Sequence, residues 1–104
     1  MKIFRQGDVI FRKVDKKFKD LESKGTEFVV ALGEKTGHKH VLKSTGDIKV
    51  SGVFGNDLKL ILASEGTITH DEHGPITLPS GTYEVSQERE LDYAKDASAR
   101  ASID

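Results

Sequence analysis

The sequence predicts a small, mainly β domain, folded as an antiparallel β-barrel or a sandwich. Short apolar runs alternate with polar residues, Gly-containing turns recur at roughly ten-residue spacing, and only one stretch has helical periodicity. About seven to nine short strands of this kind are typical of barrels and sandwiches. At 104 residues the chain is expected to form one domain over residues 1–93, with residues 94–104 as a surface or frayed tail.

The first two strands are predicted on either side of a turn. Ile3–Phe4 and Val9–Phe11 are rich in the β-branched and aromatic residues that favour strands. Gln6–Asp8 lies between them and contains Gly7, a turn residue. The chain is therefore expected to open with two strands joined by this turn.

One short helix is predicted between Asp15 and Gly25. Val14, Phe18 and Leu21 stand at positions i, i+4 and i+7, which places them on one helical face. Asp15 is suited to cap the start of this helix and Gly25 to end it.

Lysines cover the rest of this predicted helix. They could form a basic patch for phosphate or nucleic acid, or a solvated face balanced by acidic neighbours. The residues concerned are Lys16, Lys17, Lys19 and Lys24. We favour the solvated face, because no aromatic side chain is interleaved with the lysines to stack on a base. Nucleic acid is therefore an unlikely partner by this criterion.

The middle of the chain places histidines on strand faces. Residues 27–32 form a nearly continuous apolar run, which predicts a strand buried on both faces. After it, His38, His40 and Leu42 share one face of an extended strand, and Lys39 faces the other way with Lys43. Lysines are costly to bury, so the histidine face is expected to point inward.

The remaining strands are predicted from the same alternation. Ile68 and His70 share a face, and because Ile68 belongs in the core, His70 should also point inward. The other alternating runs are Ile48–Val50, Leu58–Leu62, Ile76–Leu78 and Tyr83–Val85.

Composition excludes several classes of protein. The absence of cysteine removes disulfide scaffolds, thiolate metal sites and cysteine nucleophiles. A formal net charge of −1 gives no global field for nucleic acid or an anionic membrane. No apolar signal core or membrane-spanning run is found, so a cytoplasmic protein with no membrane partner is expected.

All four histidines fall into two tight pairs, His38 with His40 and His70 with His73. Neutral imidazole is a common ligand of transition metals, and both His-x-His on a strand and His-x-x-His across a turn can share one ion. The sequence therefore predicts a site for a divalent metal, with zinc, iron, manganese, nickel and copper all open. Three nitrogen ligands would leave a position for water or a small-molecule substrate, whereas four would close the site.

Two carboxylates, Asp71 and Glu72, stand inside the second pair. Either could be a ligand, could orient an imidazole, or could act as a general base on a metal-bound water, with Glu72 the candidate base. An open site would allow hydrolytic, isomerising or oxygen chemistry, and the pattern selects none of these. If one histidine is not a ligand, we expect it to be His73, which lies beyond the inward-facing His70.

The competing hypothesis is a non-enzymatic interaction module or viral accessory protein with structural histidines. A domain this small gains stability from self-association, so a homo-oligomer is compatible with both hypotheses.

The residues His38-Lys39-His40 resemble the first motif of the cupin barrels, and Pro79–Gly81 resembles the Pro-x-Gly of the second. This resemblance implies a cupin-like barrel with His38 and His40 as metal ligands. The motif departs from the cupin pattern where Ser44 and Thr45 replace the expected glutamate, and where Glu84 stands in place of the last histidine.

A second resemblance covers nearly the whole chain. The chain is similar to a family of short uncharacterised proteins from microbes and their viruses. The similar stretches include residues 36–40 with Gly-His-x-His, residues 70–76 with His-x-x-His, and residues 78–85. That resemblance implies a specific small β domain and no particular chemistry.

Overall fold

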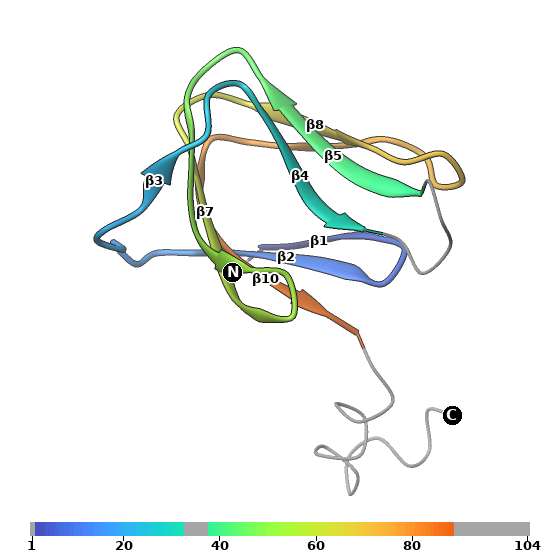
Figure 1. Cartoon of the computed structure of the whole chain (residues 1–104), viewed down its shortest axis with the longest axis horizontal. Helices are drawn as coiled ribbons and strands as arrows, with labels where there is room; N and C mark the ends of the chain where they lie inside the picture. The colour runs from blue at the N-terminus through green and yellow to red at the C-terminus, as the bar shows by residue number, and fades with distance from the viewer. Residues whose placement is uncertain (1, 33–37, 89–104) are drawn as a thin grey trace, which may run out of the picture.

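The computed structural model describes residues 2–32 and 38–88, which form ten β-strands (Figure 1). The expected tail over residues 94–104 lies outside the described residues. The strands are β1 (Lys2–Gln6), β2 (Val9–Val14), β3 (Glu22–Ser23), β4 (Glu27–Leu32), β5 (Lys39–Ser44), β6 (Ile48–Val53), β7 (Asn56–Leu62), β8 (Gly66–Thr69), β9 (Ile76–Leu78) and β10 (Gly81–Gln87).

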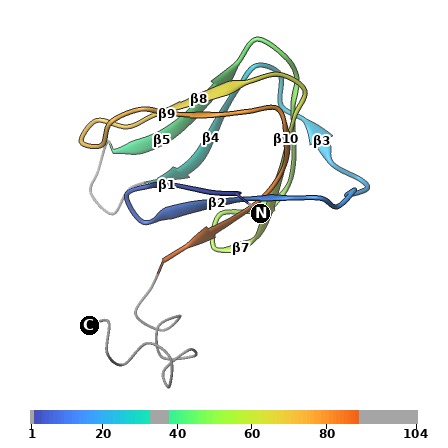
Figure 2. The ribbon, with the colours of Figure 1, turned by 180° about the vertical axis from the view of Figure 1, so that it is seen from behind.

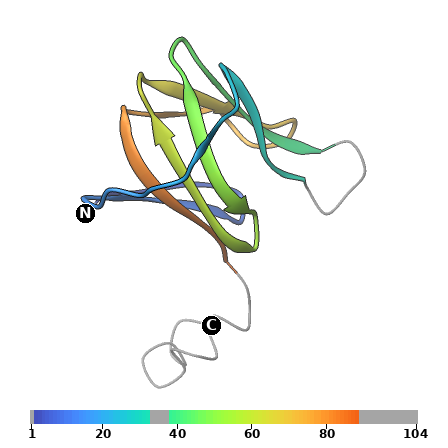
Figure 3. The same cartoon turned by 60° about the vertical axis from the view of Figure 1, so that its left-hand side comes forward.

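The strands form two antiparallel sheets. One has the order β1-β2-β10-β7-β6-β3 and the other the order β4-β5-β8-β9. Figure 2 shows β5, β8 and β9 stacked over the β1–β2 hairpin, and Figure 3 shows the two sheets from the side. The predicted mainly β fold is confirmed, and within the described ranges the two antiparallel sheets do not close into a barrel.

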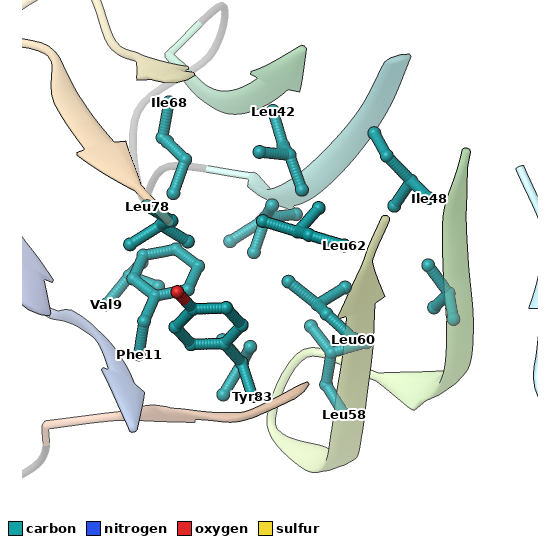
Figure 4. Close-up of a cluster of buried hydrophobic side chains, with 14 residues drawn as sticks. Val9, Phe11, Leu42, Ile48, Leu58, Leu60, Leu62, Ile68, Leu78 and Tyr83 are labelled. Atoms are coloured by element: carbon teal, nitrogen blue, oxygen red, sulfur yellow. The ribbon is translucent and has the colours of Figure 1, made fainter. Parts of the chain in front are cut away.

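The core lies between the two sheets (Figure 4). Leu58, Leu60 and Leu62 of β7 alternate with exposed or half-buried residues and are almost completely buried, as the sequence predicts. Each such leucine contributes about 1.5–3 kcal/mol by leaving water. From the other sheet, Leu42 of β5 and Ile68 of β8 enter the same cluster.

The predicted helix between Asp15 and Gly25 is wrong. Among the described residues no helix is present, and this stretch is irregular up to β3. Asp20 has a φ of 64°, in the left-handed region that interrupts a right-handed helix. Phe18, predicted to lie on an apolar helical face, instead lies under the ammonium group of Lys59, which is 5.2 Å from its ring centroid. A helix this short needs tertiary packing along one whole face, which these contacts do not provide.

The strand predicted over residues 27–32 is present as β4, but it is not buried on both faces. β4 pairs only with β5 and forms the edge of its sheet. Val29 is 41% exposed, whereas Val30 and Ala31 are buried, and a bulge between Val29 and Ala31 shifts the register. The apolar run therefore belongs to an edge strand, in which a bulge changes which side chains face the core.

The β1–β2 turn and the β8–β9 loop lie on the same side of the molecule (Figure 1). Gly7 in the turn has a φ of 62°, as the first residue of a two-residue hairpin turn of type II′ requires. β1 contacts β9 across the space between the sheets. This end of the fold therefore joins the two regions from which the histidine site is built.

The described part of the chain contains no helix long and apolar enough to cross a membrane.

Candidate metal centre

The four imidazoles come together at one end of the fold. His40 lies on β5 and His38 just before it, while His70 follows β8 and His73 lies in the loop before β9. β5 and β8 are neighbouring antiparallel strands, with Val41 opposite Thr69, so their histidine-bearing ends meet. Two pairs separated by thirty positions in the chain thus form a single cluster.

His70 lies at the centre of this histidine cluster. Its ring centroid is 4.3 Å from that of His40, 4.7 Å from His73 and 5.8 Å from His38. The centroids of His40 and His73 are 6.2 Å apart. The planes of these four ring pairs differ by only 13° to 42°, so the rings are stacked or tilted over one another.

A buried glutamine fixes the proton on His40. The Nε2 atom of Gln6 donates to the carbonyl oxygens of Ile68 and Gly74, at 2.9 Å each, so its Oε1 is the atom that faces the imidazole. Nδ1 of His40 lies 2.8 Å from this oxygen and must therefore donate its proton to it. In the neutral ring, Nε2 of His40 is left with a free lone pair, the form that binds metals.

The environment of His40 keeps the ring neutral. The residue is 3% exposed, and its pKa is lowered from 6.5 to about 4, mainly by burial. The neighbouring His70 and His73 contribute to this lowering, because like charges repel, and Asp8 opposes it. At neutral pH the ring therefore has no proton to lose from Nε2 before it can coordinate a metal.

His70 is held in the opposite tautomer. The backbone N–H of Glu72 donates to its Nδ1 at 3.0 Å, so in the neutral ring the proton is on Nε2. To become a ligand, His70 must lose the hydrogen bond from Glu72. It could then bind the metal through Nδ1, or move its proton to Nδ1 and bind through Nε2. Either change is confined to one contact in the exposed loop after β8.

His38 has a buried nitrogen without a partner. Its Nδ1 is shielded from solvent and has no hydrogen-bond partner within residues 2–32 and 38–88. The nearest carboxylate oxygens are Oδ2 of Asp71 at 3.8 Å and Oε1 of Glu72 at 3.9 Å, too far for a hydrogen bond. A buried polar nitrogen without a partner is costly, and a metal ion or a proton shared with these carboxylates would satisfy it.

His73 is exposed and lies against the β1–β2 turn. A Cβ atom placed on Gly7 would be 2.7 Å from Nε2 of His73 and 3.0 Å from its Cδ2. The glycine therefore leaves room for this ring beside the rest of the cluster.

The cluster is not arranged around a metal position as it stands. Among the residues that the structure describes, no group of three or more His, Asp or Glu side chains is placed to hold a metal ion. The stacked ring planes and the Glu72 contact of His70 account for this, because the nitrogens do not all point to one centre. The four predicted residues are brought together, but their side chains would have to rotate.

Comparison with known proteins places the chain in a family. A family model described as a domain of unknown function, DUF8820, matches residues 5–88. The chain belongs to this DUF8820 family. No curated protein and no solved structure matches it.

In this DUF8820 domain the residue that sequence reasoning missed is Gln6. It is 3% exposed and connects β1, the end of β8 and the loop that carries His73. The sequence contains a signal for this residue. Phe4 and Gln6 share one face of β1, so an amide occupies a core-facing position at which an apolar residue is usual. A buried amide needs partners, and its partner here is a predicted ligand.

Proposed function

We propose that this DUF8820 domain binds one divalent transition-metal ion through its histidine cluster, His38, His40, His70 and His73. The observation that supports this most directly is the hydrogen bond from Nδ1 of His40 to Oε1 of Gln6. Metal-binding histidines characteristically donate their second ring N–H to a carbonyl, carboxylate or water, which fixes the tautomer and orients the ring. Gln6 is in that relation to His40.

The spacing of the rings supports the proposal. Metal–nitrogen bonds of about 2 Å at a tetrahedral centre put the ring centroids of two histidine ligands roughly 5 Å apart. The centroid distances in the histidine cluster run from 4.3 to 6.2 Å. Binding therefore requires rotation of side chains more than movement of strands, with His70 making the largest change.

The donor set selects a class of metal. Neutral imidazoles suit zinc, copper, iron and nickel, and with carboxylate help manganese, while magnesium and calcium prefer oxygen ligands. His40 is the anchor because it is buried and fixed, and His73 is the ligand most readily replaced because it is exposed. The cupin resemblance likewise implies His38 and His40 as ligands.

With three histidines bound, the fourth position would be open to water or a small molecule. Glu72 is then the candidate general base, since its carboxylate already lies 3.9 Å from His38 on the exposed side of the cluster. A bound metal would supply Lewis acidity and lower the pKa of a coordinated water. The cytoplasm, expected from the sequence, is the proposed compartment of this all-nitrogen site.

The test uses the full chain without a histidine tag. Elemental analysis after purification should find close to one transition-metal ion per chain, and a chelator should lower the melting temperature. His40→Ala should remove the metal, and the matched change Lys39→Ala, at the exposed neighbouring position, should keep it. Because His40→Ala leaves Oε1 of Gln6 without its partner, His38→Ala serves as a second variant that preserves all the Gln6 contacts.

Substoichiometric metal, together with a melting temperature that does not change when chelator is added, would refute the metal proposal. It would favour the second candidate, a non-enzymatic interaction or viral accessory module in which the stacked imidazoles are structural. The near-parallel planes of His40 and His73, 13° apart, are the observation that favours this alternative. In that case His38→Ala should change stability without any change in bound metal.

A further inference from the structure

A group of basic side chains lies at the opposite end of the β1–β2 hairpin from the histidine cluster. A cleft of about 720 Å³ lies there, lined by Lys2, Arg12, Lys13 and Lys16 and by the carboxylates of Asp15 and Glu84. Lys2 pairs with Lys13 four residues along β1 from the Gln6–Val9 pair, which places the cleft roughly 13 Å from the turn beside the histidines. Its volume lies within the range of about 300–1,000 Å³ found for small-molecule sites.

Four cationic side chains and two carboxylates line this basic cleft, and three of the four cations form no ion pair with the described residues. The side chains of Lys2, Arg12 and Lys13 make no hydrogen bond or ion pair with residues 2–32 or 38–88. Glu84 stands directly opposite Arg12 in the β2–β10 register, but its Oε2 lies 3.6 Å from Nζ of Lys16 instead. Among the described residues, no partner therefore engages the guanidinium donors of Arg12, although a carboxylate is next to it in the sheet.

The lysines are placed where they repel one another. Lys2 and Lys13 are directly opposite on antiparallel strands, a position in which like charges destabilise a sheet. Lys13 is also confined, because its Cε lies 2.7 Å from the position that a Cβ on Gly81 would occupy. Its side chain thus lies over a glycine, next to Lys2, and neither lysine forms an ion pair with the described residues.

We propose that this basic cleft binds a small soluble ligand carrying two or more phosphate groups. Several unpaired cations around one cleft call for several negative charges, and a free guanidinium can bind phosphate oxygens in a bidentate manner. Binding would relieve the repulsion between Lys2 and Lys13 and would use the donors of Arg12 that no carboxylate engages. The site does not depend on the histidine cluster or on a metal.

Calorimetric titration of the metal-free full chain tests this at neutral pH and low salt. Inorganic tripolyphosphate probes charge alone, and adenosine triphosphate probes charge with a planar body. One or both should bind at one ligand per chain, with an affinity that falls as salt is added. If only adenosine triphosphate binds, the ligand is a nucleotide; if both bind alike, phosphate groups alone are recognised.

The variant Arg12→Gln with Lys13→Gln should weaken binding by about tenfold or more, as expected for loss of charge-assisted bonds. The matched control Lys43→Gln with Lys49→Gln removes the same charge from exposed positions on β5 and β6 and should bind as the native chain does. No saturable binding, equal weakening in both variants, or binding of a single-stranded oligonucleotide alone would overturn the proposal. Circular dichroism of both variants confirms that each is folded.

Discussion

Gln6 and His40 form a buried pair in which the imidazole donates from Nδ1 to the amide oxygen at 2.8 Å. The two residues come from different sheets, β1 and β5, and both are 3% exposed. The amide nitrogen of Gln6 also holds the carbonyls of Ile68 and Gly74. One side chain therefore joins the sheets at the histidine end, fixes a tautomer and positions the loop that carries His73.

Gln6→Leu should lower the free energy of unfolding by about 3 kcal/mol. The change leaves Nδ1 of His40 and the carbonyls of Ile68 and Gly74 without their partner, and each such buried group costs about 1–3 kcal/mol, partly relieved by water at the loop. Urea unfolding followed by circular dichroism measures the loss. If the metal proposal is right, the variant should also bind metal about 10–100-fold more weakly.

Lys39→Ala is the control for both measurements, since Lys39 is exposed on the strand of His40. A Gln6→Leu protein as stable as the native chain would mean that the amide contacts contribute nothing net, and that His40 is oriented by packing alone.

Strand alternation predicted the core and the inner face of the site because burial in a sheet depends on a period of two that the sequence shows directly. Lys39 and Lys43 are exposed while His40 and Leu42 are buried, as expected from the cost of burying lysine. The meeting of the two histidine pairs also rests on pairing between β5 and β8, which no local pattern contains. Sequence could place His38, His40 and His70 on inner faces, but local patterns could not pair the two strands that carry them.

The errors have a common physical origin in tertiary context. Phe18 satisfied a helical spacing, yet the contact that it makes is with Lys59 of β7, 41 residues away. The run over β4 is apolar because of the bulge at Val30 and the neighbouring sheet, not because both faces are covered. Gln6 was overlooked because its partners, His40, Ile68 and Gly74, are all distant in the chain.

Stability should fall as the pH is lowered from about 6.5 to about 4, and His40 should account for part of this fall. Burial lowers the pKa of His40 to about 4, so in this interval the unfolded chain takes up a proton that the folded chain does not. The contribution is fully present above pH 6.5 and is lost as the pH approaches 4. His40→Gln should unfold with a shallower pH dependence, as measured by urea titrations at several pH values. An unchanged slope would show that other groups carry the acid sensitivity.

Gly7→Ala should lower the free energy of unfolding by about 1–2 kcal/mol, since a φ of 62° is unfavourable for alanine. The new Cβ would also displace the ring of His73. Gly74→Ala is the matched control in the same region, because a Cβ there meets nothing within 4 Å, and it should change stability by no more than about 0.5 kcal/mol. Combining Gly7→Ala with His73→Ala separates the two causes: the loss that remains is the backbone cost, and a complete recovery would contradict the assigned strain.

Tyr83 provides a test of the core that is independent of the histidines. It is fully buried, its hydroxyl donates to the carbonyl of Pro79 at 2.5 Å, and burial raises its pKa to about 12. Because the folded chain holds this proton more tightly than the unfolded chain, stability should decline as the pH rises from about 10 to about 12. The phenolate absorbance that distinguishes the native chain from Tyr83→Phe should therefore have its midpoint near 12, and a midpoint near 10 would place the hydroxyl in water. At neutral pH, Tyr83→Phe should cost about 1 kcal/mol, the net value of the lost hydrogen bond, since the ring itself still fills its place.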